Sequence, residues 1–128
     1  IDTKHITFEY SLQPTIIQAN MNLIYIVINN LLSNAVKYSN EGAKIYVSCG
    51  EKDGKSYIRI QDEGCGIEKE NISKIFESFY REKKDRNAEG FGLGLSQAMK
   101  IAELYGGGIY VESTKNKGSI FTFFIPKP

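Results

Sequence analysis

The segment from Asn20 to Tyr38 constrains the fold of this chain more than any other, because it combines helical periodicity with two different faces. Asn30, Asn34 and Lys37 follow one another at i, i+4 and i+7, so they share one face over successive turns. A neighbouring face is apolar and is expected to pack against a core, with Ile24, Val27, Ile28, Leu31, Leu32 and Ala35 as its members. We therefore expect one long helix that packs along one stripe and presents two amides and an ammonium along another.

The polar face of this segment admits two interpretations. Amide oxygens suit a hard cation and a lysine suits phosphate, so the three side chains are candidate ligands for a phosphate and its metal ion. Taken alone, however, such a stripe is more typical of solvated positions on an ordinary amphipathic helix. A nucleotide site therefore needs support from the rest of the chain.

The remaining periodicities predict five strands and two further helices. Residues 6–12 alternate apolar and polar side chains and predict a strand with one buried face. Four more strands are expected at 44–50, 55–61, 109–113 and 119–125, with hairpin turns at 52–54 and 116–118, and shorter helices at 68–76 and 95–105. Glycines 106–108 are expected to end the last helix, and Asn20 or Asn22 is available as the N-cap of the first.

The elements follow the order β-α-β-β-α-loop-α-β-β, with hairpins and without regular βαβ alternation. This order argues against a doubly wound parallel sheet. We expect an α/β sandwich of the α+β class, in which a mixed, mostly antiparallel five-stranded sheet carries three helices on one face.

Composition narrows the class of protein. With 128 residues, the whole chain (1–128) has the size of a single domain. The net charge of +1 gives no electrostatic reason to expect nucleic acid or an anionic membrane as a partner. No apolar run approaches a membrane span, and two cysteines are too few for a disulfide scaffold, which favours a reducing, cytoplasmic setting. The chain begins with Ile1 rather than Met, so we expect a fragment of a longer protein.

A glycine motif, Asp62-x-Gly64-x-Gly66, comes directly after a predicted strand. A carboxylate at a strand end can accept a hydrogen bond from an exocyclic amine, and glycines let the backbone pass close to a flat ring. Taken alone, the motif is more typical of a tight turn with a solvated Asp.

A second motif, Gly90-x-Gly92-x-Gly94, opens a predicted helix, where backbone N–H groups form an anion site. Its spacing fits neither the Rossmann fingerprint nor the P-loop, and a flexible hinge explains it equally well. The segment before it, residues 75–81, is aromatic and ends at Arg81, which is either a solvated charge or a second cation for a terminal phosphate.

Each motif is weak alone, but their order along the chain is informative. The set reads Asn-x-x-x-Asn-x-x-Lys-Tyr from residue 30, Asp-x-Gly-x-Gly from 62, Phe-x-x-Phe-Tyr-Arg from 76, Gly-x-Gly-x-Gly-Leu-Ser from 90 and Gly-Ser-x-Phe from 118. It resembles the N, G1, F and G2 boxes and the terminal strand of the catalytic, ATP-binding domain of bacterial sensor histidine kinases, in the GHKL ATPase superfamily. The resemblance covers residues 6–126 and implies the histidine kinase-like ATPase fold.

The resemblance implies a site for ATP and Mg²⁺. Asn34 would hold the metal ion and Asn30 would support it, while Lys37 would meet phosphate and Tyr38 would lie along the nucleotide. The other implied nucleotide-binding residues are Asp62, Gly64, Gly66, Ile67, Phe79, Tyr80, Arg81, Gly90, Gly92, Leu93, Gly94, Leu95 and Ser119.

At the adenine end, the resemblance implies that Asp62 accepts the adenine amine and that Ser119 backs it, at a position where the family often has Thr. At the other end, residues 80–92 would form a lid over ATP. Arg81 would reach the terminal phosphate, and Gly92 and Gly94 would take the phosphates together with the following helix.

One departure separates this chain from the hydrolases of the superfamily, such as gyrase. They place a Glu four residues before the magnesium Asn, as a base for water, and here that position is Asn30. An amide has no useful basicity near neutral pH, so we expect transfer to an external nucleophile rather than hydrolysis. Alignment and charge stabilisation dominate phosphoryl transfer, and Asn30, Lys37 and Arg81 are the expected catalytic residues.

The acceptor is expected on another domain. His5 is the only histidine, and it lies at the edge of a predicted strand without the helical context of a phosphoacceptor. The resemblance implies a histidine-containing dimerisation domain in a homodimeric, membrane-anchored parent, a response regulator beyond it, and a monomeric isolated domain in the cytoplasm. Two alternatives stay open: a non-catalytic ATP-binding signalling module and a GHKL-type serine kinase.

Overall fold

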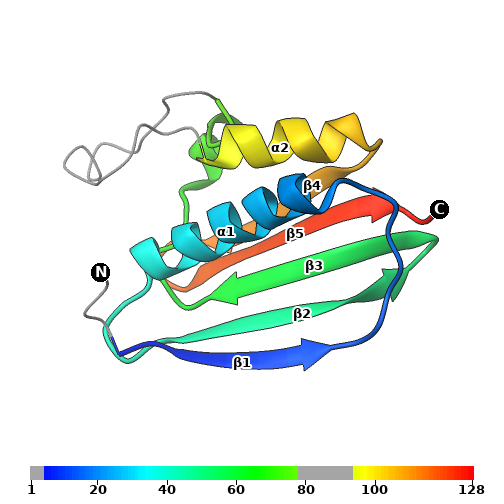
Figure 1. Ribbon diagram of the computed structural model, residues 1–128. Coiled ribbons are helices and arrows are strands. Elements are labelled where there is room, and N and C mark those ends of the chain that lie inside the picture. Colours follow the sequence, from blue (N-terminus) through cyan, green and yellow to red (C-terminus); the bar gives the residue numbers. More distant parts are fainter. Residues whose placement is uncertain (1–4, 78–93) are drawn as a thin grey trace.

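The computed structural model describes residues 5–77 and 94–128 of the chain (Figure 1). No helix among these residues is long and apolar enough to cross a membrane. In chain order the elements are β1 Thr7–Leu12, α1 Met21–Tyr38, β2 Lys44–Lys52, β3 Lys55–Asp62, the 3₁₀ helix η1 Lys69–Lys74, α2 Gly94–Leu104, β4 Gly108–Thr114 and β5 Gly118–Pro126.

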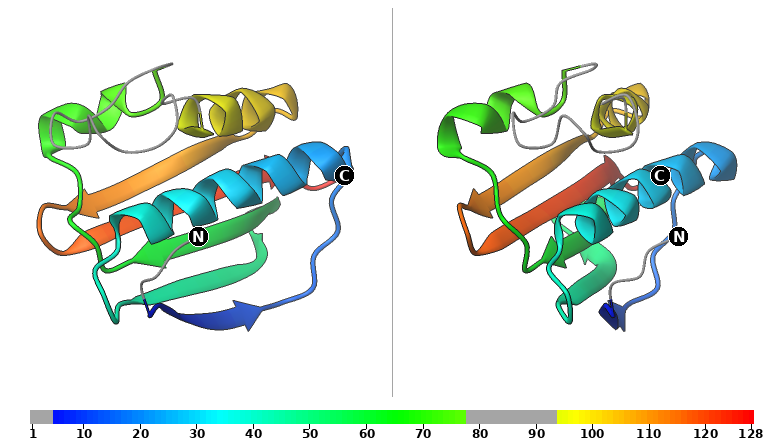
Figure 2. Two further views of the ribbon diagram at one scale, coloured as in Figure 1. Left: turned by 60° about the vertical axis from the view of Figure 1, so that its left-hand side comes forward. Right: turned by 90° about the vertical axis from the view of Figure 1, so that its left-hand side faces the viewer.

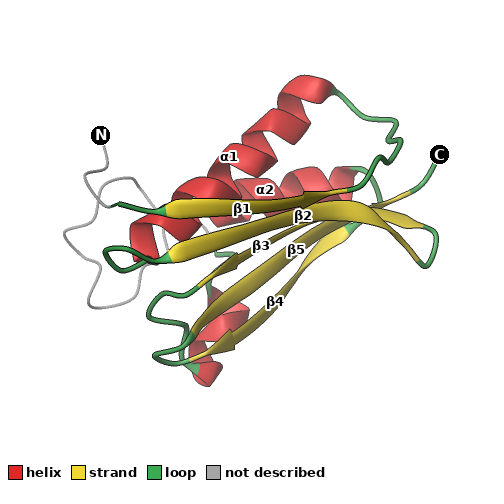
Figure 3. Ribbon diagram, turned by 90° about the horizontal axis from the view of Figure 1, so that it is seen from below, coloured by secondary structure: helices red, strands yellow, loops and turns green. Residues whose placement is uncertain are grey.

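The five strands form one mixed sheet in the order β1-β2-β3-β5-β4. Only β1 and β2 pair in parallel, with α1 as the connection between them, and the other three pairs are antiparallel. The two α-helices and η1 lie over one face, and the opposite face is open (Figures 1 and 3). This arrangement confirms the expected sandwich, although the expected helix at 68–76 is a shorter 3₁₀ helix.

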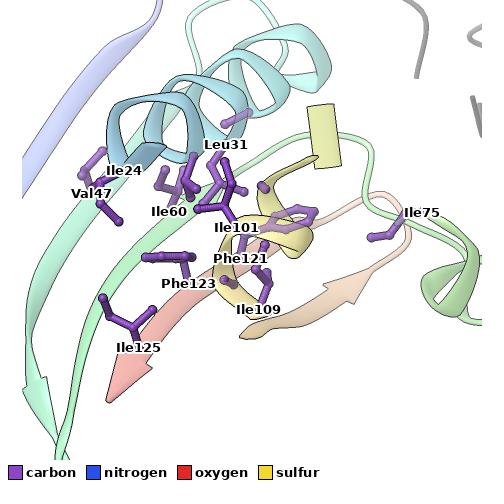
Figure 4. Close-up of a cluster of buried hydrophobic side chains, with 14 of the residues drawn as sticks. Ile24, Leu31, Val47, Ile60, Ile75, Ile101, Ile109, Phe121, Phe123 and Ile125 are labelled. Atoms are coloured by element: carbon purple, nitrogen blue, oxygen red, sulfur yellow. The ribbon is translucent and has the colours of Figure 1, made fainter. Parts of the chain in front are cut away.

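The core lies between the helices and the covered face of the sheet (Figure 4). Alternate residues of the strands point into it, most regularly in β5, where buried and half-buried side chains alternate. The most buried side chains come from all layers: Val27, Leu31, Ala35, Ile45, Ile60, Ala98, Ala102, Phe121, Phe123 and Ile125. The apolar stripe of α1 therefore packs as expected and leaves the neighbouring polar face outside the core.

The sequence-based expectation that the first strand buries one face is wrong. All six residues of β1 are exposed, and Tyr10 and Leu12 keep 64% and 61% of their surface. The reason is position: β1 is the edge strand beyond β2, while α1 packs over β3, and α2 over β4 and β5. Alternation predicted which side chains share a face, but not whether a helix covers it.

The N-terminus of α1 is capped by Asn20, whose Oδ1 accepts hydrogen bonds from the N–H groups of Asn22 and Leu23 at 2.8 and 3.3 Å. We expect Asn20→Ala to lower the free energy of unfolding by about 1 kcal/mol, because these two N–H groups lose their acceptor. Urea unfolding followed by circular dichroism measures this loss. Asn22→Ala, inside the first turn, is the matched control, and an equal loss in both variants would contradict the capping role.

Candidate functional site

A row of polar side chains crosses the covered face of the sheet at the end of the core. Asp62 of β3 pairs directly with Ser119 of β5, and Ser119 pairs with Ser113 of β4. The three side chains share one face, because paired residues of neighbouring strands point to the same side. Asp62 and Ser119 are 5% and 6% exposed, so both belong to the small set of buried polar residues.

Asp62 is held as an acceptor. Its Oδ1 accepts a hydrogen bond from the backbone N–H of Gly64 at 2.9 Å, and its carboxyl also accepts from the backbone N–H of Ser119. Burial raises the pKa of Asp62 above its usual value, and these two N–H groups work in the opposite direction. Since an ionised carboxylate has four acceptor positions, Asp62 keeps capacity for a donor from a ligand.

The raised pKa of Asp62 makes stability depend on pH in a defined sense. Between the ordinary value of 3.8 and the raised pKa, the folded chain holds a proton that the unfolded chain has lost. Below this window the carboxyl is neutral in both states, and above it the folded state carries the cost of a buried charge. The contribution of Asp62 to the free energy of unfolding therefore falls as pH rises through the window.

We expect the difference in unfolding free energy between Asp62→Asn and the unmodified chain to grow in favour of the variant as pH rises through this window. Urea titrations from pH 3.5 to pH 7 measure it. Asp53→Asn, in the exposed β2–β3 hairpin, is the matched control for the loss of one carboxyl group. A difference that does not change with pH would show that burial of Asp62 has no energetic consequence.

The glycine loop after β3 is clamped between the end of α1 and the β4–β5 hairpin. A Cβ at Gly64 would lie 2.2 Å from the carbonyl oxygen of Tyr38, and a Cβ at Gly66 would lie 2.1 Å from that of Thr114. The N–H of Cys65 donates to the carbonyl oxygen of Tyr38 at 3.3 Å. Both glycines are therefore required by close approach to the chain itself, and their approach to a ligand ring stays a prediction.

The polar face of α1 meets the beginning of α2. The Nδ2 of Asn30 donates to the Oε1 of Gln97 at 3.2 Å, and a Cβ at Gly94 would lie 3.5 Å from the Oδ1 of Asn30. Figures 1 and 2 show the two helices side by side over the sheet. Asn34 lies half-buried on the next turn of α1, and the Nζ of Lys37 lies 5.4 Å from the centre of the Tyr38 ring. The amides and the ammonium thus line the same side of the helix, as their spacing predicted.

One possible kind of metal site in the described residues is a free metal ion held by clustered ionisable side chains. No group of three or more His, Cys, Asp or Glu side chains comes together within residues 5–77 and 94–128. A magnesium ion bound to a nucleotide needs fewer protein ligands, because phosphates and water supply most of its coordination and one protein oxygen can suffice. The residue predicted for that single place is Asn34, and its role as a metal ligand stays a prediction.

The structure places the predicted residues in two groups. One group lies at the end of β3, in the loop after it and at the start of β5: Asp62, Gly64, Gly66, Ile67 and Ser119. The other described residues lie on α1 and at the start of α2: Asn30, Asn34, Lys37, Tyr38, Gly94 and Leu95. Six predicted site residues lie outside the described part of the chain: Phe79, Tyr80, Arg81, Gly90, Gly92 and Leu93.

In the described part of the chain, Gln97 and Ser113 bond directly to predicted residues and were not predicted from the sequence. Gln97 holds the amide of Asn30, and Ser113 lies 2.8 Å from the hydroxyl of Ser119. Ser113 could have been found by counting back across the turn at 116–118, since a hairpin fixes which residues face one another. Gln97 carries no such signal, because its partner lies on another helix far away in the sequence.

Comparison with known proteins agrees with this geometry. Residues 19–128 match the family described as Histidine kinase-, DNA gyrase B-, and HSP90-like ATPase. The chain is 38% identical over 114 residues to the sensor histidine kinase WalK of Bacillus subtilis (strain 168). This alignment covers 86% of the chain and 19% of WalK.

Solved structures give the same result. The mycobacterial sensor histidine kinase MprB superimposes with a TM-score of 0.85 at 26% identity, over 96% of this chain and 83% of that chain. Full-length ShkA, solved in complex with AMPPNP, gives 0.82 at 26% identity, over 95% of this chain and 26% of ShkA. The match spans both helices, four of the five strands and both polar groups, so the chain belongs to the family of histidine kinase-, DNA gyrase B- and HSP90-like ATPases, and these relatives are sensor histidine kinases.

Proposed function

We propose that this chain binds Mg-ATP and transfers the γ-phosphate to a histidine on a separate dimerisation domain of its parent protein. The observation that carries the proposal is the buried carboxylate of Asp62, held by the N–H groups of Gly64 and Ser119 and paired across the strands with Ser119. A buried carboxylate with unused lone pairs is stabilised when a ligand supplies a further hydrogen-bond donor. The exocyclic amine of adenine is such a donor.

The phosphates are assigned to the predicted residues on α1 and at the start of α2. Lys37 and the first N–H groups of α2 offer positive charge and donors, and the start of α2 packs on Asn30. Asn34 is assigned as the protein ligand of Mg²⁺, which when bound neutralises part of the phosphate charge. The structure of full-length ShkA in complex with AMPPNP supports nucleotide binding as a property of this group of proteins.

Transfer is favoured over hydrolysis because Asn30 donates its amide hydrogen to Gln97 and has no basic atom for activating water. In the proposed step a ring nitrogen of the acceptor histidine attacks the γ-phosphorus. The N–P bond forms as the bond to the bridging oxygen of ADP breaks, and the ring releases its proton. The chain itself aligns the nucleotide and stabilises charge.

The partners follow from the same proposal. The alignment with WalK covers 19% of that protein, which supports a longer parent that carries the acceptor domain outside this chain. We propose that the parent is a homodimer anchored in the cell membrane with this domain in the cytoplasm, and that the phosphate passes from its histidine to a response regulator. His5 is exposed, two residues before β1, and bonds to Glu41, so it is not assigned as the acceptor.

The test mixes this chain with the purified dimerisation domain of its parent and ATP labelled at the γ-phosphate. Label should appear on the dimerisation domain, survive alkali and be lost in acid, as expected for a phosphorylated imidazole. A dimerisation domain with its histidine replaced by Gln is the control and should stay unlabelled.

The two alternatives give different results in the same experiment. ATP binding without labelled domain would favour a non-catalytic signalling module. Label that survives acid would favour a serine kinase. Either result would overturn the proposed transfer to histidine.

A further inference from the structure

β1 carries an apolar stripe that no other element in the described chain covers. Phe8, Tyr10 and Leu12 are exposed, and the rings of Phe8 and Tyr10 stack with their centres 6.3 Å apart. Phe8 and Tyr10 pair with Ile45 and Val47 of β2, which are buried in the core. Since paired residues point to the same side, the stripe lies on the helix side of the sheet, at its edge (Figure 3).

The backbone of β1 is paired on one side only. The N–H groups of Thr7 and Gln13 donate to carbonyl oxygens on the β2 side, at 3.1 Å each. Backbone groups point to alternate sides along a strand, so those of Phe8, Tyr10 and Leu12 point away from β2. β1 is an edge strand of the described sheet, and it contains no proline, no lysine and no bulge. Such an edge can pair with a strand of another chain.

β1 is complementary to a second copy of itself. In an antiparallel pair centred on Tyr10, the outward N–H and C=O groups of Phe8 meet those of Leu12 of the other copy, and Tyr10 meets Tyr10. The same register places the two apolar stripes opposite each other on one face. On the other face Glu9 lies opposite Ser11, so like charges do not meet directly. A shift by one residue would set outward groups against inward ones, so hydrogen bonding itself excludes it.

We propose that two copies of this chain associate through β1, in antiparallel register about Tyr10, and so join their sheets into one. The contact is isologous, because each copy contributes the same strand, so it closes as a dimer and does not extend into a filament. One strand pair makes a small interface, so the isolated domain should be monomeric at low concentration and dimeric at high concentration. A homodimeric parent would favour the contact by holding two copies near each other.

This association does not depend on the proposed function. The residues assigned to the nucleotide lie on α1, α2, β3 and β5, and β2 separates β1 from these strands. The outer edge of β1 is therefore available to a second copy with or without a nucleotide.

Sedimentation equilibrium of the unmodified chain tests the proposal, at concentrations up to about 1 mM, where a dissociation constant in the millimolar range still gives a measurable dimer. The average mass should rise toward twice that of one chain. Tyr10→Lys should weaken the association by about tenfold or more, because it sets two ammonium groups opposite each other across the two-fold axis. Tyr110→Lys, at an exposed tyrosine of the other edge strand β4, is the matched control and should leave the association unchanged.

A pair of opposite charges tests the register. Tyr10→Glu should associate as poorly as Tyr10→Lys when each variant is alone. A mixture of the two should associate about as tightly as the unmodified chain, because a carboxylate then meets an ammonium across the axis. Tyr10 is exposed and its backbone points away from β2, so both variants should keep the circular dichroism spectrum of the unmodified chain.

A second measurement needs no variant. In a mixture of isotope-labelled and unlabelled chains, filtered nuclear Overhauser spectra should show contacts between Phe8 of one copy and Leu12 of the other. These two side chains lie four positions apart on one strand, so such contacts within a single copy are not expected.

Four results would overturn the inference. The mass of one chain at every concentration would refute the association, and absence of the contacts between Phe8 and Leu12 would refute the register. A mixture of the two Tyr10 variants that associates no better than either alone would show that Tyr10 does not meet Tyr10. Association that survives Tyr10→Lys but is lost in Tyr25→Lys would place the contact on the exposed side of α1 instead. None of these results bears on ATP binding, which the labelling experiment tests separately.

Discussion

Asp62→Asn is expected to weaken ATP binding by about ten- to a hundredfold, which is the effect of losing a hydrogen bond to a charged partner. The Oδ1 of Asn can still accept from Gly64, but its Nδ2 is a donor and cannot accept from the adenine amine. Calorimetry with ATP measures the loss. Affinity for ITP should fall less, because its carbonyl oxygen accepts from the new amide.

The matched control is Glu63→Gln, which alters the next carboxylate along the chain, an exposed one. It should bind ATP like the unmodified chain. If Asp62→Asn and Glu63→Gln behave alike, or if the unmodified chain binds ITP as well as ATP, then Asp62 does not read the adenine amine.

Asn34→Ala is expected to remove the Mg²⁺-dependent part of ATP binding, with a loss of about tenfold or more in the presence of Mg²⁺. The reason is that the proposed magnesium ion has one protein ligand, and methyl cannot replace an amide oxygen. Affinity measured in EDTA should be the same for the variant and the unmodified chain. The comparison between the two conditions therefore isolates the metal from the rest of the site.

Asn29→Ala is the matched control for this prediction, because Asn29 is an exposed amide on a different face of the same helix. It should retain the full response to Mg²⁺. An Asn34→Ala variant with an unchanged response would refute the metal assignment, whereas a loss of affinity in EDTA as well would indicate damage to α1 rather than to a ligand.

Local patterns predicted most of the elements because their causes are local. The stripe of α1 has a helical period, and the β2–β3 hairpin turns at Asp53 and Gly54, whose positive φ values of 54° and 76° suit those residues. Asn20 rather than Asn22 caps the helix, a choice that the sequence left open. The helix and the hairpin could be predicted because each depends only on residues a few positions apart in the chain.

What the sequence did not predict depends on residues that meet from far apart. The exposure of Tyr10 follows from the place of β1 in the sheet, and no pattern within β1 records that place. Gln97 reaches Asn30 only because α2 packs beside α1. The row of Asp62 and Ser119 came from the resemblance to a family, because strands β3 and β5 become neighbours only in the folded sheet.

The pairing of β3 with β5 also has a consequence for how the domain opens. These central strands enclose residues 63–117 as one long loop, which includes the glycine loop, α2 and β4, so their ladder cannot form until that loop closes. A nucleotide held at Asp62 and Ser119 touches both strands and binds only the closed loop. Saturation with ATP should therefore slow amide hydrogen exchange along the whole ladder, including the pair of Ile58, which packs against the core, and Phe123, which lies in it, several residues away from Asp62 and Ser119.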